Sequence, residues 1–184
     1  MALDEVDLLA RLGVRARARV RPLGERRVVW VELSDGSLAP PLTAQAGALW
    51  EEAVRTALRE RIPLVTVINS AGADIREGIA ALAGWGRVAR TLTEASGVIP
   101  TIAILDGPAV SGPALLLGMT DLTVATEGSY AFVNGAVMVR QFTGIDVSKE
   151  ELGSPSSLER NAGVPVAVVG DLAAACDLVE DLLA

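Results

Sequence analysis

The chain is organised around two loops, Asn69-Ser70-Ala71-Gly72-Ala73-Asp74 and Asp106-Gly107-Pro108-Ala109-Val110-Ser111-Gly112-Pro113. Each loop follows a short apolar run, Leu64–Ile68 or Thr101–Leu105, and opens a stretch with helical patterning. We therefore predict that both are strand-to-helix turns. Small residues let backbone N–H groups approach a ligand closely, and a helix start adds partial positive charge. A facing pair of such turns is typical of an oxyanion hole, although single glycine-containing turns are also ordinary connections.

The candidate catalytic groups in these loops are backbone N–H donors rather than side chains. The predicted donors are Gly72, Ala73, Ser111 and Gly112. Proline has no N–H, so Pro113 is excluded. A nucleophilic serine is given little weight, because the sequence contains no histidine to act as its base.

Composition bounds the class of protein. The 184 residues are enough for one domain with a proper core, and we treat residues 1–184 as a single domain. Hydrophobic residues make up 51% of the chain but aromatic residues only 3%, and the mean hydropathy is +0.41. This aliphatic excess favours burial against another subunit, with an unusually aliphatic core as the alternative. The net charge of −7 argues against a nucleic-acid partner.

Positive charge gathers near the start of the chain. Seven arginines lie between Arg11 and Arg27, whereas 171–184 carries only acidic charges. Such an arm suits a phosphate or an acidic partner, and a solvated strand and turn is the equally weighted alternative. The residues expected to bind substrate are Ala71, Gly107, Arg15, Arg17 and Arg19.

Several chemistries are not expected from this sequence. The lone Cys176 and the absence of histidine make a disulfide or a metal site unexpected. The acidic start lacks a signal-peptide layout, and glycine and proline interrupt every apolar stretch before it is long enough to span a membrane. We therefore predict a soluble cytoplasmic protein that does not bind membranes.

Strands and helices are predicted to alternate along the chain, which defines an α/β protein with largely parallel pairing. The predicted strands are Arg15–Arg21, Val28–Leu33, Leu64–Ile68, Thr101–Leu105, Leu122–Thr126, Tyr130–Val133 and Val164–Val169. The predicted helices include a lead-in at 1–12, Thr43–Arg61, Ile75–Ala95, a short helix to Gly118, Val137–Phe142 and Asp171–Leu183. A turn is expected at Ser34–Ser37, and the inner stripe of the second long helix is assigned to Ile75, Ile79, Leu82 and Leu92.

Several spaced motifs resemble the N-terminal half of the carboxyltransferase component of biotin-dependent acyl-CoA carboxylases, the propionyl-CoA carboxylase β type. The first loop through Gly78 is similar to DSGGARIQEG, and Gly107–Asp121 is similar to GPCAGGAVYSPALTD. Ser129–Gly135 resembles SYLFITG, and Asp146–Gly153 resembles DVTQEELGG. Ala95–Pro100 also matches the family closely. The resemblance covers most of the chain, and the motifs occur in the family's order.

That family belongs to the crotonase superfamily, so the resemblance implies a crotonase-like ββα spiral. It also implies backbone oxyanion holes that stabilise a thioester enolate. In such a carboxyltransferase, carboxybiotin on a partner carrier supplies carbon dioxide and the biotin nitrogen accepts the α proton. A chain without histidine fits this chemistry.

This sequence departs from the family at several positions. The paired glycines of the second loop become Ser111-Gly112, and the Asp and Arg of the first loop become Asn69 and Asp74. The family usually continues into a second crotonase-like half that carries the biotin side. We expect that half to be a separate chain, or the biotin reaction to be lost.

The main hypothesis is the acyl-thioester-binding subunit of a split carboxyltransferase in a hetero-oligomer, with an acyl-CoA or acyl carrier protein thioester as substrate. One alternative is a malonyl-thioester decarboxylase without biotin, and another is a non-catalytic scaffold subunit. An enoyl-CoA hydratase is rejected, because the positions of its two glutamates hold Leu115 and Ala136 or Val137.

Overall fold

The computed structural model describes residues 16–34, 39–164 and 166–184, and its described strands form one seven-stranded sheet. The strand order is β1-β2-β3-β4-β5-β7, with β6 paired to the far end of β4. Only β1 and β2 pair antiparallel, as a hairpin, and all the other described pairs are parallel. The strands are β1 (Arg17–Leu23), β2 (Arg26–Glu32), β3 (Leu64–Ser70), β4 (Thr101–Val110), β5 (Leu122–Thr126), β6 (Tyr130–Phe132) and β7 (Val166–Val169).

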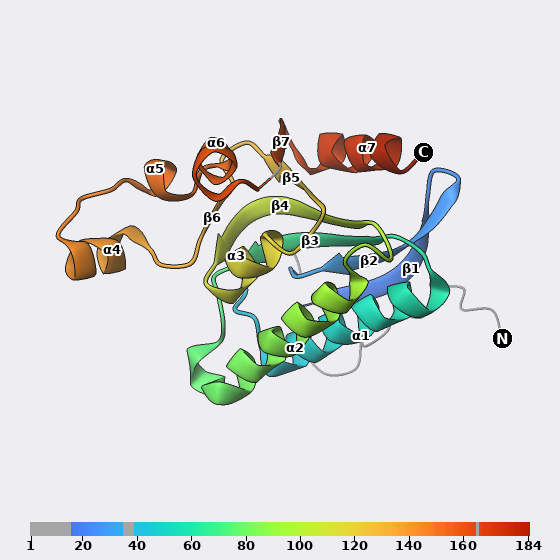
Figure 1. Cartoon of the computed structure of the whole chain (residues 1–184), viewed down its shortest axis with the longest axis horizontal. Helices are drawn as coiled ribbons and strands as arrows, with labels where there is room; N and C mark the ends of the chain where they lie inside the picture. Colours follow the sequence, from blue (N-terminus) through green and yellow to red (C-terminus); the bar gives the residue numbers. More distant parts are fainter. Residues whose placement is uncertain (1–15, 35–38, 165) are drawn as a thin grey trace.

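Helices cover both faces of this sheet, with α1 and α2 side by side on one face and α7 on the other (Figure 1). The long helices are α1 (Ala44–Glu60), α2 (Ile79–Ala95) and α7 (Leu172–Leu183). The shorter helical segments are η1 (Ile75–Glu77), α3 (Gly112–Leu117), α4 (Ala136–Thr143), α5 (Lys149–Gly153), α6 (Pro155–Ser157) and η2 (Leu158–Ala162). The predicted α/β alternation with largely parallel pairing is confirmed.

Two apolar clusters fill the space on either side of the sheet. The larger one joins α1 and α2 to the sheet through side chains such as Trp50, Leu92 and Leu105. The smaller one packs Val179 of α7 against Val65 and other strand residues. Because the central strands are covered on both faces, burial in β3 and in the first half of β4 is nearly continuous rather than alternating.

Local signals in the sequence account for most helix ends. The Thr43 side chain caps α1, and Asp171 caps α7 by accepting from the Ala174 N–H at 2.9 Å. Ser148 and Glu151 form a capping box at the start of α5, because each side chain accepts from the other residue's backbone N–H. The caps at Thr43 and Asp171 lie where the sequence predicts helix starts.

The prediction of one helix over Ile75–Ala95, with an inner stripe that begins at Ile75, is wrong. The backbone breaks at Gly78, which has a φ of +55° and separates η1 from α2. Ile75 and Ile79 are 92% and 83% exposed, and of the predicted stripe only Leu92 is buried. The close approach of α1 and α2 is made at Gly84, which contacts Ala44 and Gly47 of α1. The buried residues of α2 are Ala81, Gly84, Val88, Thr91, Leu92 and Ala95.

One predicted strand is longer than expected, and two predicted elements lie wholly or mostly outside the described residues. The strand predicted to end at Leu105 continues to Val110, because the second half of β4 pairs with β6. The lead-in helix at 1–12 and most of the turn at Ser34–Ser37 lie outside the described residues.

The close approach of α1 and α2 makes Gly47 a sensitive position. A Cβ on Gly47 would lie 2.8 Å from the Gly84 carbonyl carbon, whereas a Cβ on Gly86 would have no neighbour within 4 Å. We expect Gly47→Ala to lower the free energy of unfolding by about 1–3 kcal/mol through overpacking. Gly86→Ala should raise it by about 0.5–1 kcal/mol. Urea denaturation of both variants checks this, and equal effects of the two substitutions would contradict the packing argument.

Candidate functional site

The two loops meet at the carboxyl ends of β3 and β4, as the sequence predicts. Ser70 at the end of β3 pairs with Ala109 of β4. Gly72 has a φ of +108°, and a Cβ there would lie 3.1 Å from the Val110 carbonyl oxygen and 3.5 Å from the Ser111 Cβ. A glycine is therefore required at position 72 for both its backbone conformation and the contact between the loops.

The first loop is held by the segment that leads into α1. Ser70 Oγ donates to the Pro40 carbonyl at 2.9 Å, and the Leu42 N–H donates to the Gly72 carbonyl at 2.7 Å. The Asp74 N–H then donates back to the Leu42 carbonyl at 3.0 Å. These bonds fix the backbone on both sides of Ala73, so its N–H has a defined position.

The hydrogen bonds divide the four predicted donors into two groups. The Ser111 N–H donates to the Phe132 carbonyl at 3.0 Å, and the Gly72 N–H makes a longer bond to Ser70 Oγ at 3.3 Å. Ser111 is therefore corrected from a free donor to a residue whose N–H joins the second loop to β6. Within the described part of the chain, the predicted donors whose N–H groups have no acceptor are Ala73 and Gly112.

Gly112 begins α3 directly beneath an aromatic ring. A Cβ on Gly112 would lie 2.9 Å from Trp85 Cγ, so the glycine lets α2 approach the start of α3. The N–H of a first helical residue has no partner within its own helix, which explains why that of Gly112 remains available.

Ser111 has a backbone conformation that disfavours a side chain, with a φ of +61° and a ψ of −122°. A non-glycine residue there costs about 1–3 kcal/mol, and the serine side chain makes no hydrogen bond to the start of α3 that would offset this cost. We expect Ser111→Gly to raise the free energy of unfolding by about 1 kcal/mol, measured by denaturant titration. Ser111→Ala, which keeps the strain, should leave it unchanged; a gain from alanine instead would point to the hydroxyl.

Asp74 is buried beside the donor loop and is tied to Arg76. Its carboxylate accepts from Arg76 Nε at 2.9 Å, from the second guanidinium nitrogen at 2.7 Å, and from the Arg76 backbone N–H at 3.0 Å. These bonds, the side-chain ones foremost, lower the pKa of Asp74 from 3.8 to about 2.

The lowered pKa predicts how Asp74 links stability to pH. Because the folded pKa lies below the unfolded value of 3.8, its contribution is complete above that value and is lost as the pH falls towards 2. In Asp74→Asn we expect a smaller loss of unfolding free energy over this pH interval than in the unchanged chain. Urea titrations at several acidic pH values measure how the free energy of unfolding changes with pH. The same change in both proteins would disprove the link.

The predicted arginine site is only partly within the described residues, because Arg15 lies outside them. Arg17 and Arg19 are exposed on β1, where Arg17 pairs in register with Glu32 at the carboxyl end of β2. Through β2, Arg17 is level with Val67 in the middle of β3 and Arg19 with Val65 near its amino end, so Arg17 lies nearer the edge of the sheet that carries the loops. Arg19 also forms an ion pair with Glu32 at 3.5 Å, which leaves Arg17 as the less neutralised cation.

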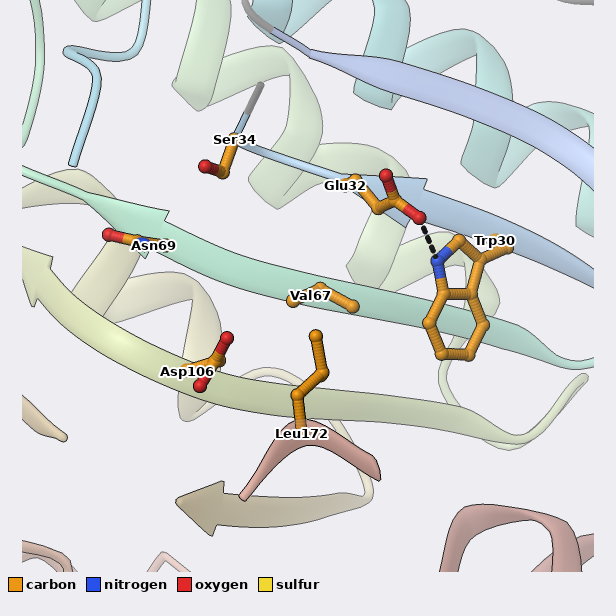
Figure 2. A pocket seen from close by; sticks show the side chains of 7 residues that line it. All are labelled: Trp30, Glu32, Ser34, Val67, Asn69, Asp106 and Leu172. Carbon is orange, nitrogen blue, oxygen red and sulfur yellow. Dashed lines mark hydrogen bonds between the residues drawn. The ribbon is translucent and has the colours of Figure 1, made fainter. Parts of the chain in front are cut away.

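A pocket of about 400 Å³ opens on the α7 face of the sheet, and no sequence motif predicts it. Figure 2 shows the Glu32 and Asp106 side chains lining it, with Trp30 Nε1 donating to Glu32 at 2.8 Å. Asp106 accepts from Thr126 Oγ1 at 3.0 Å. Two carboxylates disfavour an anion, so this pocket does not suit a phosphate group.

Two absences concern only the part of the chain that the structure describes. Residues 16–34, 39–164 and 166–184 contain no group of three or more metal-ligating side chains. No helix in these ranges combines the length and apolar character needed to cross a membrane. A cytoplasmic location remains a prediction.

The parallel sheet with helices on both faces and two facing loops defines a crotonase-like α/β protein. Residues 27–184 match the carboxyl transferase domain, and the chain belongs to that family. The structure of the transcarboxylase 12S hexamer, solved with hydrolysed methylmalonyl-CoA, superimposes with a TM-score of 0.86 at 27% identity over 91% of this chain and 33% of that one. The predicted family resemblance and fold class are confirmed.

Curated relatives include both carboxylases and decarboxylases. The acetyl-/propionyl-CoA carboxylase β6 subunit of Mycobacterium tuberculosis is 37% identical over 63% of this chain and 24% of its own length. The methylmalonyl-CoA decarboxylase α subunit of Veillonella parvula is 32% identical over 77% of this chain and 30% of its own length. The chain thus spans about a quarter to a third of these relatives, which are enzyme subunits that act on acyl-CoA.

Proposed function

We propose that this chain is the acyl-thioester-binding part of a biotin-dependent carboxyltransferase, and that the Ala73 and Gly112 N–H groups stabilise a thioester enolate. The observation that carries the proposal is the pair of N–H groups without acceptors on two loops in contact. Both donors belong to a rigid backbone, so they need no rearrangement when negative charge develops on the carbonyl oxygen.

In this proposal the chain supplies electrostatic stabilisation and orientation, but no acid or base. The thioester oxygen accepts from Ala73 and Gly112, which lowers the cost of removing the α proton. The nearby positions Leu115 and Val137 are apolar and exposed, so the group that accepts this proton belongs to another component. Carboxybiotin, held by a partner, supplies the carboxyl group in enzymes of this type.

A second crotonase-like half is the partner that we propose. Exposed apolar side chains occupy the end of the molecule where η1, the start of α2 and α4 lie (Figure 1). They include Ile75, Ile79, Val137 and Phe142. Apolar side chains of this number and size at one end of a chain are typical of an interface. We assign no residue of this chain to the biotin ring. The end that carries these apolar side chains instead suits the second half, which would hold the biotin.

We further propose that Arg17 and Arg19 bind the phosphate end of coenzyme A or of a phosphopantetheine arm. Both residues are exposed, Arg17 is the nearer of the two to the loop edge of the sheet, and an arginine fork pairs well with phosphate. If so, charge reversal of Arg17 should weaken CoA binding more than charge reversal of the ion-paired Arg19.

Decarboxylation of a malonyl-type thioester is the second candidate function, and the Veillonella parvula relative favours it. The same two donors would stabilise the enolate left when carbon dioxide departs. The enolate carbon then takes a proton in place of a carboxyl group, so no biotin is required.

The test is co-purification of the tagged chain from its native cells, with mass spectrometry of the bound proteins and two assays. Carboxylation of an acyl-CoA that requires a biotinylated carrier supports the main proposal. Carbon dioxide release from a malonyl thioester without biotin selects the decarboxylase. A stable complex in which substitution of the donor loops changes neither reaction would assign this chain a scaffold role instead.

A further inference from the structure

A second cavity lies beside α3, the helix that begins at Gly112. Its volume is about 470 Å³, and it is lined by side chains from α3, β6, α4, α5 and η2. Leu115 and Leu117 contribute from α3, Phe132 from β6, and Val139 from α4. Cavities of about 300–1,000 Å³ with apolar walls are typical of small-molecule sites.

The chemistry of the lining selects an uncharged aliphatic ligand. Of the described residues that line the cavity, Asn134 alone has a polar side chain and none is charged. A carboxylate or phosphate placed here would lose its hydration without gaining a partner, which is costly. A hydrocarbon chain would instead gain free energy with every methylene removed from water.

The cavity and the second donor loop share two elements, β6 and α3. Phe132 lines it and accepts the Ser111 N–H at 3.0 Å. Leu115 follows Gly112 by three residues in α3, which corresponds to about 4.5 Å along a helix axis. A group whose carbonyl oxygen bonds to the Gly112 N–H therefore has this cavity within reach of its next few carbon atoms.

We propose that this cavity holds the hydrocarbon chain of the acyl thioester, and that it selects uncharged acyl groups longer than propionyl. The assignment rests on the proposed thioester site at Ala73 and Gly112. Leu115 and Val133, which are 45% and 44% exposed, stand where the chain would enter.

The test measures binding of propionyl-, butyryl-, hexanoyl- and octanoyl-CoA to the full chain by calorimetry. Affinity should rise about two- to fourfold for each added methylene. Leu115→Asp should remove most of this dependence, so that the affinity for octanoyl-CoA falls more than about tenfold relative to the affinity for propionyl-CoA. The matched control is Leu182→Asp on α7, because Leu182 is similarly exposed and distant from the cavity.

A second series, the methyl esters of the same fatty acids, separates the cavity from the thioester site. If the cavity is assigned correctly but the donor pair is not, the esters still bind with a chain-length dependence that Leu115→Asp removes. Affinity that is flat with chain length in both series overturns the assignment. So does a Leu115→Asp variant that changes the sedimentation of the chain but not its affinity for acyl chains, since the cavity would then be a contact between copies.

Discussion

Replacing the Ala73 residue by lactic acid should lower the turnover of the purified complex by about 10²–10³-fold, the usual effect of losing one oxyanion-hole donor. The exchange turns the peptide N–H into an ester oxygen and keeps the methyl side chain. Because the Ala73 N–H has no acceptor among the described residues, the folded chain loses no donor bond, and only the Gly72 carbonyl, which accepts from the Leu42 N–H, becomes a weaker ester acceptor. The expected result is therefore a much lower rate with a loss of stability of no more than about 1 kcal/mol, measured by initial rates together with urea denaturation.

Lactic acid at Ala174 provides the matched control. The Ala174 N–H donates to Asp171 Oδ1 at 2.9 Å in the cap of α7, on the other side of the sheet. This exchange should cost about 1 kcal/mol of stability through the lost cap but leave the rate intact. A loss of less than about threefold at Ala73, with the fold retained, would remove that residue from the proposed site.

Gly112 calls for the same ester chemistry rather than an ordinary substitution. Any residue with a Cβ, proline included, would place that Cβ 2.9 Å from Trp85 Cγ, which is too close for two carbon atoms. A fall in rate would then mix a packing defect with the loss of a donor. Glycolic acid at Gly112 removes the N–H without adding a Cβ, although it also weakens the Ser111 carbonyl that accepts from the Ala114 and Leu115 N–H groups. Its effect on the rate should be similar to that of lactic acid at Ala73.

The sequence was sufficient to predict elements whose signals are local. Caps such as Thr43 and Asp171 and continuous apolar strands such as Leu64–Ile68 depend on neighbouring residues, so they occur where expected. The contact between the two loops was also predictable, because the ends of adjacent parallel strands meet at one edge of a sheet. Fold class and loop positions thus follow from patterns that span only a few residues.

The details of the site depend on contacts between distant segments, which local patterns do not contain. The Ser111 N–H is occupied because β6, about twenty residues further along the chain, pairs with the end of β4. Ile75 and Ile79 were assigned to the core because apolar residues recur there at helical spacing. Both are exposed, because the chain breaks at Gly78 and α2 buries a different set of residues. The apolar cavity combines side chains from residues 114 to 164, so no single motif marks it.

The second large expected effect concerns the binding of the proposed partner to exposed apolar residues of α4. Phe142 on α4 is 81% exposed, and Val137 of the same helix is also exposed. An aromatic side chain is the kind of residue that dominates protein interfaces. We expect Phe142→Asp to weaken binding of the proposed second half by about 30-fold or more, since losing such an anchor costs about 2–4 kcal/mol.

The substitution should leave the isolated chain folded, because Phe142 makes little contact with the described core. Its free energy of unfolding should change by less than about 0.5 kcal/mol, as is usual for exposed positions. Surface plasmon resonance with the co-purified partner measures the affinity, and Leu182→Asp on α7 again serves as the control for an exposed apolar residue elsewhere. If both variants bind the partner as the unchanged chain does, α4 is not part of the interface. If only Leu182→Asp weakens binding, the partner covers the α7 face, and the donor loops are then left open to solvent.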